Sequence, residues 1–187
     1  FADDYTYDAI NALGNHVINT PNLDKLVNEG TSFTNAFNMG GWHGAVCVAS
    51  RSMIISGRSL WNAKEINDQW VKKENMELVE SSWGKLMEKK GYKTYMSGKW
   101  HVSIDARKVF QTVRNIKPGM PGDFFKNDVK KGYNRPINAK DNSWIAYDSL
   151  NGGFWEGGKH WSEVLKDDAL DFIDDASSSD DPFFMLS

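Results

Sequence analysis

Three short groups of polar residues in this chain could do chemistry together. Cys47 is followed one helical turn later by Arg51, and a helix that begins at Cys47 would place both side chains on one face. The dipole at a helix N-terminus stabilises negative charge, which favours a reactive thiolate there. Lys99 and His101 form a second group, after an apolar segment, and Asp3-Asp4 form the third. A nucleophile, two cations, a proton acceptor and paired carboxylates are therefore present.

Each group also has an ordinary explanation. A single cysteine excludes an internal disulfide framework and a cysteine-based zinc site, and a lone Cys is most often a small buried hydrophobe. Asp3-Asp4 would suit a hard cation such as calcium at the end of an N-terminal strand, although a solvated loop is the better explanation of the pair taken alone. Lys-x-His on a loop is common. The residues around each group are therefore needed to distinguish a chemical role from a structural one.

Short strands and helices alternate around these groups. Thr20 as cap, Pro21 at the first helical position and Gly30 as stop predict a helix. Further helices are predicted from just after Cys47 to Gly57, from about Ser82 to Gly91, and over 162–176; strands are predicted at 33–37, 92–97 and from 182 onward. This alternation favours an α/β layered fold with a mainly parallel central sheet flanked by helices.

Two regions need separate interpretation. Residues 104–160 are rich in Gly, Asn, Lys and Trp with little periodicity, which predicts long functional loops with short elements. One side of the last predicted helix carries four aspartates: Asp167, Asp171, Asp174 and Asp175. A solvated helix face explains this stripe better than a metal site does.

Composition narrows the classes of partner. The net charge of −3 without a basic block argues against nucleic acid, and no apolar run is long enough for a membrane span. Eight Trp hint at carbohydrate, which stacks on indole rings, although an aromatic-rich core is the better explanation. The chain opens without Met and closes on an apolar strand, so we expect a fold truncated at both ends.

Four blocks in order resemble the formylglycine-dependent sulfatases of the alkaline-phosphatase superfamily. They are Thr20-Pro21-Asn22-Leu23-Asp24-Lys25-Leu26, Cys47-Val48-Ala49-Ser50-Arg51, Gly98-Lys99-Trp100-His101 and Pro182-Phe183-Phe184. Together they span nearly the whole chain, so the resemblance implies that residues 1–187 are the N-terminal portion of a single sulfatase catalytic domain. Ala49 departs from the family, where proline is usual, which puts the efficiency of cysteine modification in question.

The resemblance implies a role for each matching residue. Asp3 and Asp4 match metal ligands, usually for Ca²⁺, and Cys47 matches the precursor of Cα-formylglycine, which also faces the metal. Arg51 matches the arginine that holds the formylglycine hydrate. Lys99 matches a lysine that contacts the sulfate, and His101 matches a histidine beside the formylglycine hydroxyl.

The implied reaction is the hydrolysis of a sulfate ester. One hydroxyl of the hydrated aldehyde attacks sulfur, and deprotonation of the other expels sulfate from the covalent intermediate. The cations of Lys99 and Arg51 offset the charge on the sulfuryl oxygens, and His101 is the expected proton acceptor. We also consider His43 and His160 as substrate-binding candidates, with loop packing and a helix-start position as the alternatives. The remaining metal ligands and the leaving-group acid are expected outside residues 1–187.

The substrate is expected to be a sulfated carbohydrate or another small sulfate ester. Maturation requires a formylglycine-generating or anaerobic sulfatase-maturating enzyme, and such sulfatases are usually periplasmic or secreted, or lysosomal in eukaryotes. Two alternatives stay open: a phosphonate or phosphodiester hydrolase of the same superfamily, and an inactive carbohydrate-binding remnant.

Overall fold

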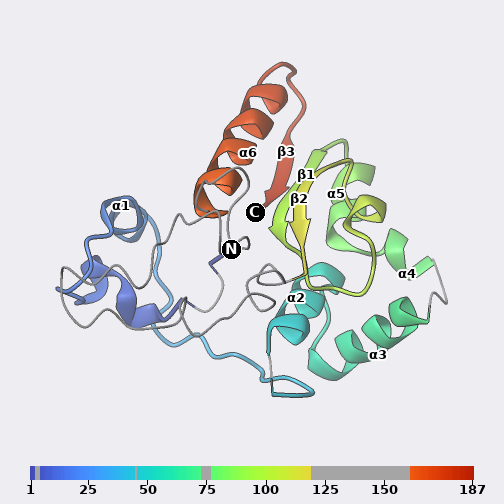
Figure 1. Cartoon of the computed structure of the whole chain (residues 1–187), viewed down its shortest axis with the longest axis horizontal. Helices are drawn as coiled ribbons and strands as arrows, with labels where there is room; N and C mark the ends of the chain where they lie inside the picture. The colour runs from blue at the N-terminus through green and yellow to red at the C-terminus, as the bar shows by residue number, and fades with distance from the viewer. Residues whose placement is uncertain (3–4, 45, 73–76, 119–160) are drawn as a thin grey trace, which may run out of the picture. The chain divides into compact units, whose positions relative to one another are not determined.

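The computed structural model describes residues 1–2, 5–44, 46–72, 77–118 and 161–187. The chain forms two compact units, Phe1–Met39 and Gly40–Ser187, which we call the N-terminal unit and the main unit (Figure 1). Each is described by itself. In the described part of the chain, no helix is both long and apolar enough to cross a membrane.

The N-terminal unit contains two 3₁₀ turns, η1 (Tyr7–Ala9) and η2 (Asn11–Leu13), and helix α1 (Pro21–Glu29). The predicted helix with Pro21 at its start and Gly30 at its end is confirmed. Thr20 is the N-cap residue, as predicted, but its hydroxyl makes no capping hydrogen bond. Instead Thr20 Oγ1 accepts a hydrogen bond from the Asn11 amide at 2.9 Å and donates one to Asp24 Oδ1 at 2.8 Å, which joins α1 to η2.

The strand predicted at 33–37 is absent, and this prediction was wrong. The segment is irregular, and Phe33 and Phe37 are 83% and 88% exposed. A strand needs a neighbour to satisfy its backbone groups, and an apolar alternation alone does not supply one. Residues 1–2 likewise form no strand, and Asp3 and Asp4 lie outside the described residues.

The main unit is built on a parallel three-stranded sheet in the order β2-β1-β3. Its strands are β1 (Lys93–Lys99), β2 (Thr112–Lys117) and β3 (Phe183–Leu186). Tyr95 is paired with Thr112 on one side and with Met185 on the other. The expected α/β fold with a parallel sheet is confirmed, as are the strands that follow Gly91 and Pro182.

Helices surround this sheet: α2 (Cys47–Ser56), α3 (Leu60–Val71), α4 (Glu77–Glu80), α5 (Trp83–Lys89) and α6 (Trp161–Ala176). Those beginning at Cys47, after Ser82 and near Ser162 were predicted. Helix α3 was missed because its buried stripe of Leu60, Ala63 and Trp70 is interrupted by the polar Asn67. Of the predicted loop region 104–160, residues 104–118 contain η3 (Ala106–Lys108) and β2, and residues 119–160 lie outside the described part.

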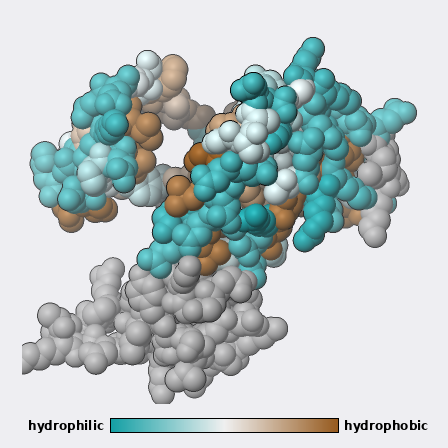
Figure 2. Space-filling model, turned by 90° about the horizontal axis from the view of Figure 1, so that it is seen from above, coloured by the Kyte–Doolittle hydropathy of each residue, from teal (hydrophilic) through white to brown (hydrophobic). Residues whose placement is uncertain are grey.

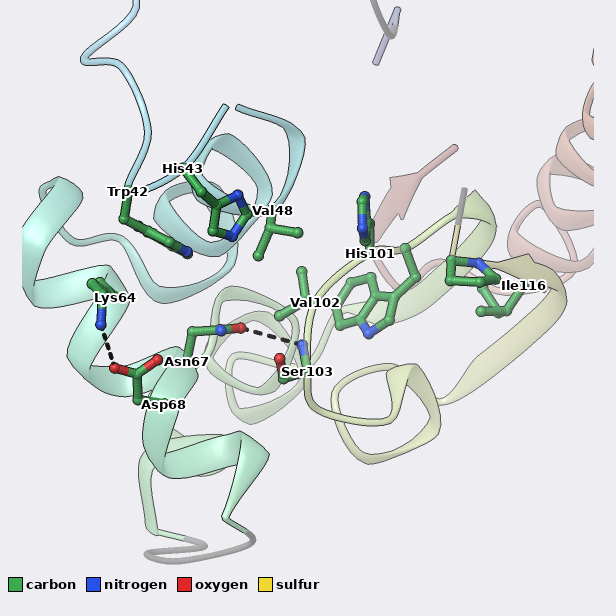
Figure 3. Close-up of a pocket in the computed structure, with 12 residues that line it drawn as sticks. Trp42, His43, Val48, Lys64, Asn67, Asp68, His101, Val102, Ser103 and Ile116 are labelled. Atoms are coloured by element: carbon green, nitrogen blue, oxygen red, sulfur yellow. Dashed lines mark hydrogen bonds and ion pairs between the residues drawn. The ribbon is translucent and has the colours of Figure 1, made fainter. Parts of the chain in front are cut away.

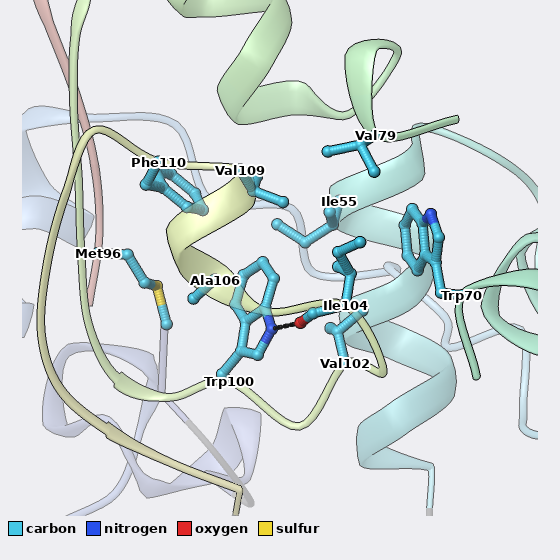
Figure 4. Close-up of a cluster of buried hydrophobic side chains, with 10 residues drawn as sticks. All are labelled: Ile55, Trp70, Val79, Met96, Trp100, Val102, Ile104, Ala106, Val109 and Phe110. Atoms are coloured by element: carbon cyan, nitrogen blue, oxygen red, sulfur yellow. Dashed lines mark hydrogen bonds between the residues drawn. The ribbon is translucent and has the colours of Figure 1, made fainter. Parts of the chain in front are cut away.

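Alternation along β1 sends its side chains into two layers. Tyr95 faces α6, where its ring packs on Phe172 with centroids 5.0 Å apart. Met96 faces the opposite layer, a core formed mainly by α2, α3 and the segment after β1 (Figure 4). In that core the indole nitrogen of Trp100 donates to the Ile104 carbonyl at 2.5 Å, so the segment after β1 is anchored by a buried ring.

The face seen in Figure 2 is largely hydrophilic, with some hydrophobic residues visible among the hydrophilic ones. None of the described residues of the N-terminal unit is buried, and this unit includes exposed apolar side chains such as Val17 and Leu26. The buried side chains of the described chain therefore all belong to the main unit.

A buried carboxylate ties α6 to the ends of two strands. Asp168 is 6% exposed and accepts hydrogen bonds from the Ser97 hydroxyl and, at 2.8 Å, from Asn115 Nδ2. The pairing shifts after Ser97, where Asn115, with a left-handed φ of 44°, is the extra residue of β2. The carboxylate therefore holds an irregular strand pair in register.

Replacing this carboxylate should destabilise the main unit. Asp168→Ala leaves the buried Ser97 hydroxyl and the half-buried Asn115 amide without this acceptor, at a cost of roughly 1 to 3 kcal/mol for the buried hydroxyl. Urea unfolding should therefore show a clear loss of stability, whereas Asp174→Ala, at an exposed position of the same helix, should change little. Equal effects of the two substitutions would contradict the assigned role.

A second contact between the sheet and α6 depends on pH. The Tyr95 hydroxyl donates to Asp175 Oδ2 at 2.5 Å, and burial, followed by this hydrogen bond and the charge of Asp175, raises the pKa of Tyr95 to about 12. A free tyrosine has a pKa of about 10, so the unfolded chain loses this proton first as pH rises. The contribution to stability is complete below about pH 10 and declines between about pH 10 and 12.

The measurement is the free energy of unfolding for the protein and its Tyr95→Phe variant at several alkaline pH values. The difference between the two should shrink as the pH rises above about 10. Tyr7→Phe serves as the control because that side chain is 79% exposed. A difference that stays constant to the alkaline limit would rule out this coupling.

Candidate functional site

Cys47 is the first residue of α2, as the sequence predicted, and its side chain is half-buried. The helix runs for 10 residues and ends at Gly57, whose φ of 63° allows the left-handed turn there. The first amides of a helix have no partner within it, and their dipoles favour negative charge. Position 47 is therefore suited to an oxygen or sulfur atom that becomes anionic.

Arg51 connects this helix to the sheet. It lies one turn after Cys47 and is only 7% exposed, and its Nη1 donates a hydrogen bond to the backbone carbonyl of Lys99. Lys99 is the last residue of β1. The bond therefore joins the N-terminal part of α2 to the carboxyl end of the central strand, where ligands bind in open α/β sheets.

The backbone turns sharply where β1 ends. The pairing of β1 with β2 shifts between Ser97 and Gly98, and Gly98 has a φ of 95° that only glycine adopts readily. A methyl group at Gly98 would also lie 3.1 Å from the side chain of Leu165 on α6. Three residues after Gly98, His101 has a φ of 49°, an uncommon value for a residue with a side chain. Strained backbone of this kind concentrates at functional sites.

Asn67 of α3 links the two segments that carry the candidate residues. Its Oδ1 accepts from the Ser52 hydroxyl of α2 at 3.4 Å and from the Ser103 amide at 3.3 Å. The side chain is 5% exposed, so these polar groups are paired within the protein. Asn67 was not predicted from the sequence. The one indication was its position as a polar residue within the apolar stripe of a helix.

These elements enclose a pocket of about 660 Å³ (Figure 3). In this view His101 and Ile116 lie on one side of the pocket, across from Trp42 and His43, and Val48, the residue after Cys47, lies between. The Lys64–Asp68 ion pair on α3 forms the lower edge in this view, with nitrogen and oxygen 2.6 Å apart. The pocket has the size of a small-molecule site.

The structure thus brings several of the predicted residues together. Arg51 contacts Lys99 directly, while His43 and His101 line one pocket beside the N-terminus of α2. Asp3, Asp4 and His160 lie outside the described residues. Among described residues no cluster of three or more His, Cys, Asp or Glu side chains could hold a metal, so the metal set stays a prediction.

Comparison with known proteins gives the family of this chain. The model of the sulfatase family matches residues 1–187. An N-acetylglucosamine-6-O-sulfatase of Bacteroides thetaiotaomicron is 26% identical over 98% of this chain and 28% of its own length. An ulvan-active sulfatase of Formosa agariphila is 26% identical over 98% of this chain and 32% of its own length.

A third relative, an arylsulfatase of Hemicentrotus pulcherrimus, is 29% identical over 87% of this chain and 31% of its own length. No solved structure matches the chain significantly. The chain spans about a third or less of the length of these relatives. With the family model covering every residue, and with Cys47, Arg51, Lys99 and His101 on elements that meet, this chain belongs to the sulfatase family.

Proposed function

We propose that the full-length protein containing this chain hydrolyses sulfate esters of carbohydrates, with Cys47 converted to formylglycine. The observation that carries the proposal is the hydrogen bond from Arg51 to the Lys99 carbonyl. It fixes the helix that begins at Cys47 against the strand that leads into His101. The family membership supports the sulfatase reaction, and the names of two relatives support a carbohydrate substrate.

The chain's own residues have separable tasks in this proposal. The N-terminus of α2 stabilises negative charge on the side chain at position 47. Arg51 and Lys99 supply positive charge toward a sulfuryl group, and hydrophobic burial of Trp100 keeps the connecting backbone fixed. His101 lies at the pocket and is suited to accept a proton.

Formylglycine and a divalent metal are the expected cofactors. When present, they would supply a geminal diol nucleophile and a Lewis acid for the sulfuryl oxygens. Position 47 fits an oxygen nucleophile because it is half-buried at a helix N-terminus. Asp3 and Asp4 are the proposed Ca²⁺ ligands in this chain, together with the modified residue 47, because carboxylate oxygens suit that ion.

Two expectations complete the proposal. Formylglycine formation requires a maturation enzyme, which would have to accept Ala49 where the family usually has proline. We also expect export to the periplasm or the exterior of the cell, or to lysosomes in a eukaryote, as for other sulfatases of this type.

Intact-peptide mass spectrometry tests the modification. After co-expression with a formylglycine-generating enzyme, the peptide containing Cys47 should lose sulfur and two hydrogens and gain one oxygen. Cys47→Ala should lack both this change and the sulfatase activity. An unmodified thiol in the active full-length protein would refute the assignment, and an unmodified thiol in an inactive protein would favour a carbohydrate-binding remnant.

Arg51→Met tests the cationic residue at the centre of the site. It keeps an unbranched side chain but removes the guanidinium, so kcat/KM for a sulfate ester should fall about 100-fold or more. Arg107→Met is the matched control, since that side chain is 71% exposed. A comparison of turnover rates for sulfate esters and phosphate diesters tests the alternative of a phosphonate or phosphodiester hydrolase. Much faster turnover of the diesters would assign the protein to that class of hydrolase instead.

A further inference from the structure

The pocket is lined by His101 but not by Cys47, Arg51 or Lys99, so most of it lies outside the residues assigned to sulfate chemistry. From His101 it reaches across Asn67 to Trp42 and the Lys64–Asp68 pair, none of which the sequence motifs include (Figure 3). At about 660 Å³ it is much larger than a sulfate group requires. The additional space is large enough for the part of the substrate that carries the sulfate.

Aromatic and apolar surface forms one part of this extension. Trp42 is half-buried, and the His43 ring meets its indole edge-on, with the ring centroids 6.1 Å apart. An indole offers a broad apolar face together with one polar edge, which suits an amphipathic ligand. Val48 and Val102 add apolar contacts between this ring and His101.

The charged part of the pocket lining, the Lys64–Asp68 pair, carries no net charge. Lys64 Nζ lies 2.6 Å from Asp68 Oδ2, so the ammonium is already neutralised by a carboxylate on the same helix. Both side chains are only partly exposed, at 38% and 48%, and Asn67 beside them is 5% exposed. A second anionic group would be repelled by Asp68, whereas neighbouring hydroxyls can both donate to the carboxylate and accept from the ammonium.

We propose that Trp42 and the Lys64–Asp68 pair form a subsite for a neutral sugar ring on the leaving-group side of the sulfate ester. The inference rests on the proposed function and adds the residues that would select a saccharide. The apolar face of the ring lies on Trp42, and its hydroxyls bond to Asp68 and Lys64. The sulfate group is then directed toward His101 and the N-terminus of α2.

The first test compares two sulfate esters in the full-length, modified enzyme. N-acetylglucosamine 6-O-sulfate supplies the sugar ring, and para-nitrophenyl sulfate supplies a leaving group without hydroxyls. Asp68→Asn and Trp42→Ala should each lower the ratio of kcat/KM for the sugar ester to that for the aryl ester. A loss of about 10-fold to 100-fold is expected, the size of a lost hydrogen bond to a charged group.

Matched controls separate recognition from general damage. Glu88→Gln breaks a Lys–Glu pair of the same 2.6 Å length on α5, and Trp61→Ala removes an indole of α3 that is 67% exposed. Both should leave the ratio unchanged. An unchanged ratio in Asp68→Asn and Trp42→Ala, or equal losses for both esters, would overturn the proposed subsite.

A binding measurement distinguishes this proposal from the proposed function. Saturation-transfer NMR with unsulfated N-acetylglucosamine oligosaccharides requires no turnover. Binding that Trp42→Ala abolishes and Trp61→Ala preserves would support the subsite even if neither sulfate ester is hydrolysed. Hydrolysis of the sugar ester without any saccharide effect of Trp42 or Asp68 would support the proposed function and refute the subsite.

Discussion

The hydrogen bond from Arg51 to the backbone carbonyl of Lys99 is the interaction on which the candidate site depends. It connects two elements whose residues lie far apart in the sequence, α2 and the end of β1. A buried guanidinium needs hydrogen-bond acceptors, and a carbonyl at a strand end has no ladder partner beyond it. This bond gives the guanidinium one acceptor and fixes the position of Cys47 relative to the turn at His101.

The rest of the main unit supports this connection from two sides. Asp168 holds the irregular end of β1 from the α6 face, while Asn67 joins α2 to the segment after β1 from the α3 face. Both side chains are buried polar groups that accept from two elements at once. Such groups specify one arrangement because every alternative leaves a donor unpaired. The backbone strain at His101 is tolerated within this framework.

Sequence reasoning worked where the local pattern and the tertiary contacts agree. Cys47 to Gly57 has a clear helix stop, and Lys93–Lys99 is a buried β-rich segment, so both were predictable. The segment around Phe33 failed because apolar residues cannot form a strand without a partner. Helix α3 was missed because the polar Asn67 occupies its buried stripe, yet that residue and its neighbours line the pocket. Family resemblance selected Lys99 and His101, but it gave no information about the Lys64–Asp68 pair.

The sheet has a consequence for the order in which the chain can fold. Strand β1 pairs with β2 through residues fewer than about 20 positions apart, but it pairs with β3 through residues roughly 90 positions apart. Closing the longer loop costs more entropy, so contacts within 47–117 are favoured to form first. During synthesis at the ribosome, the segment joining Arg51 to Lys99 is complete long before Phe183 is added. One edge of β1 therefore stays open in the nascent chain. Tyr95, whose ring packs on Phe172 of the later helix α6, is the buried residue that a chaperone would protect.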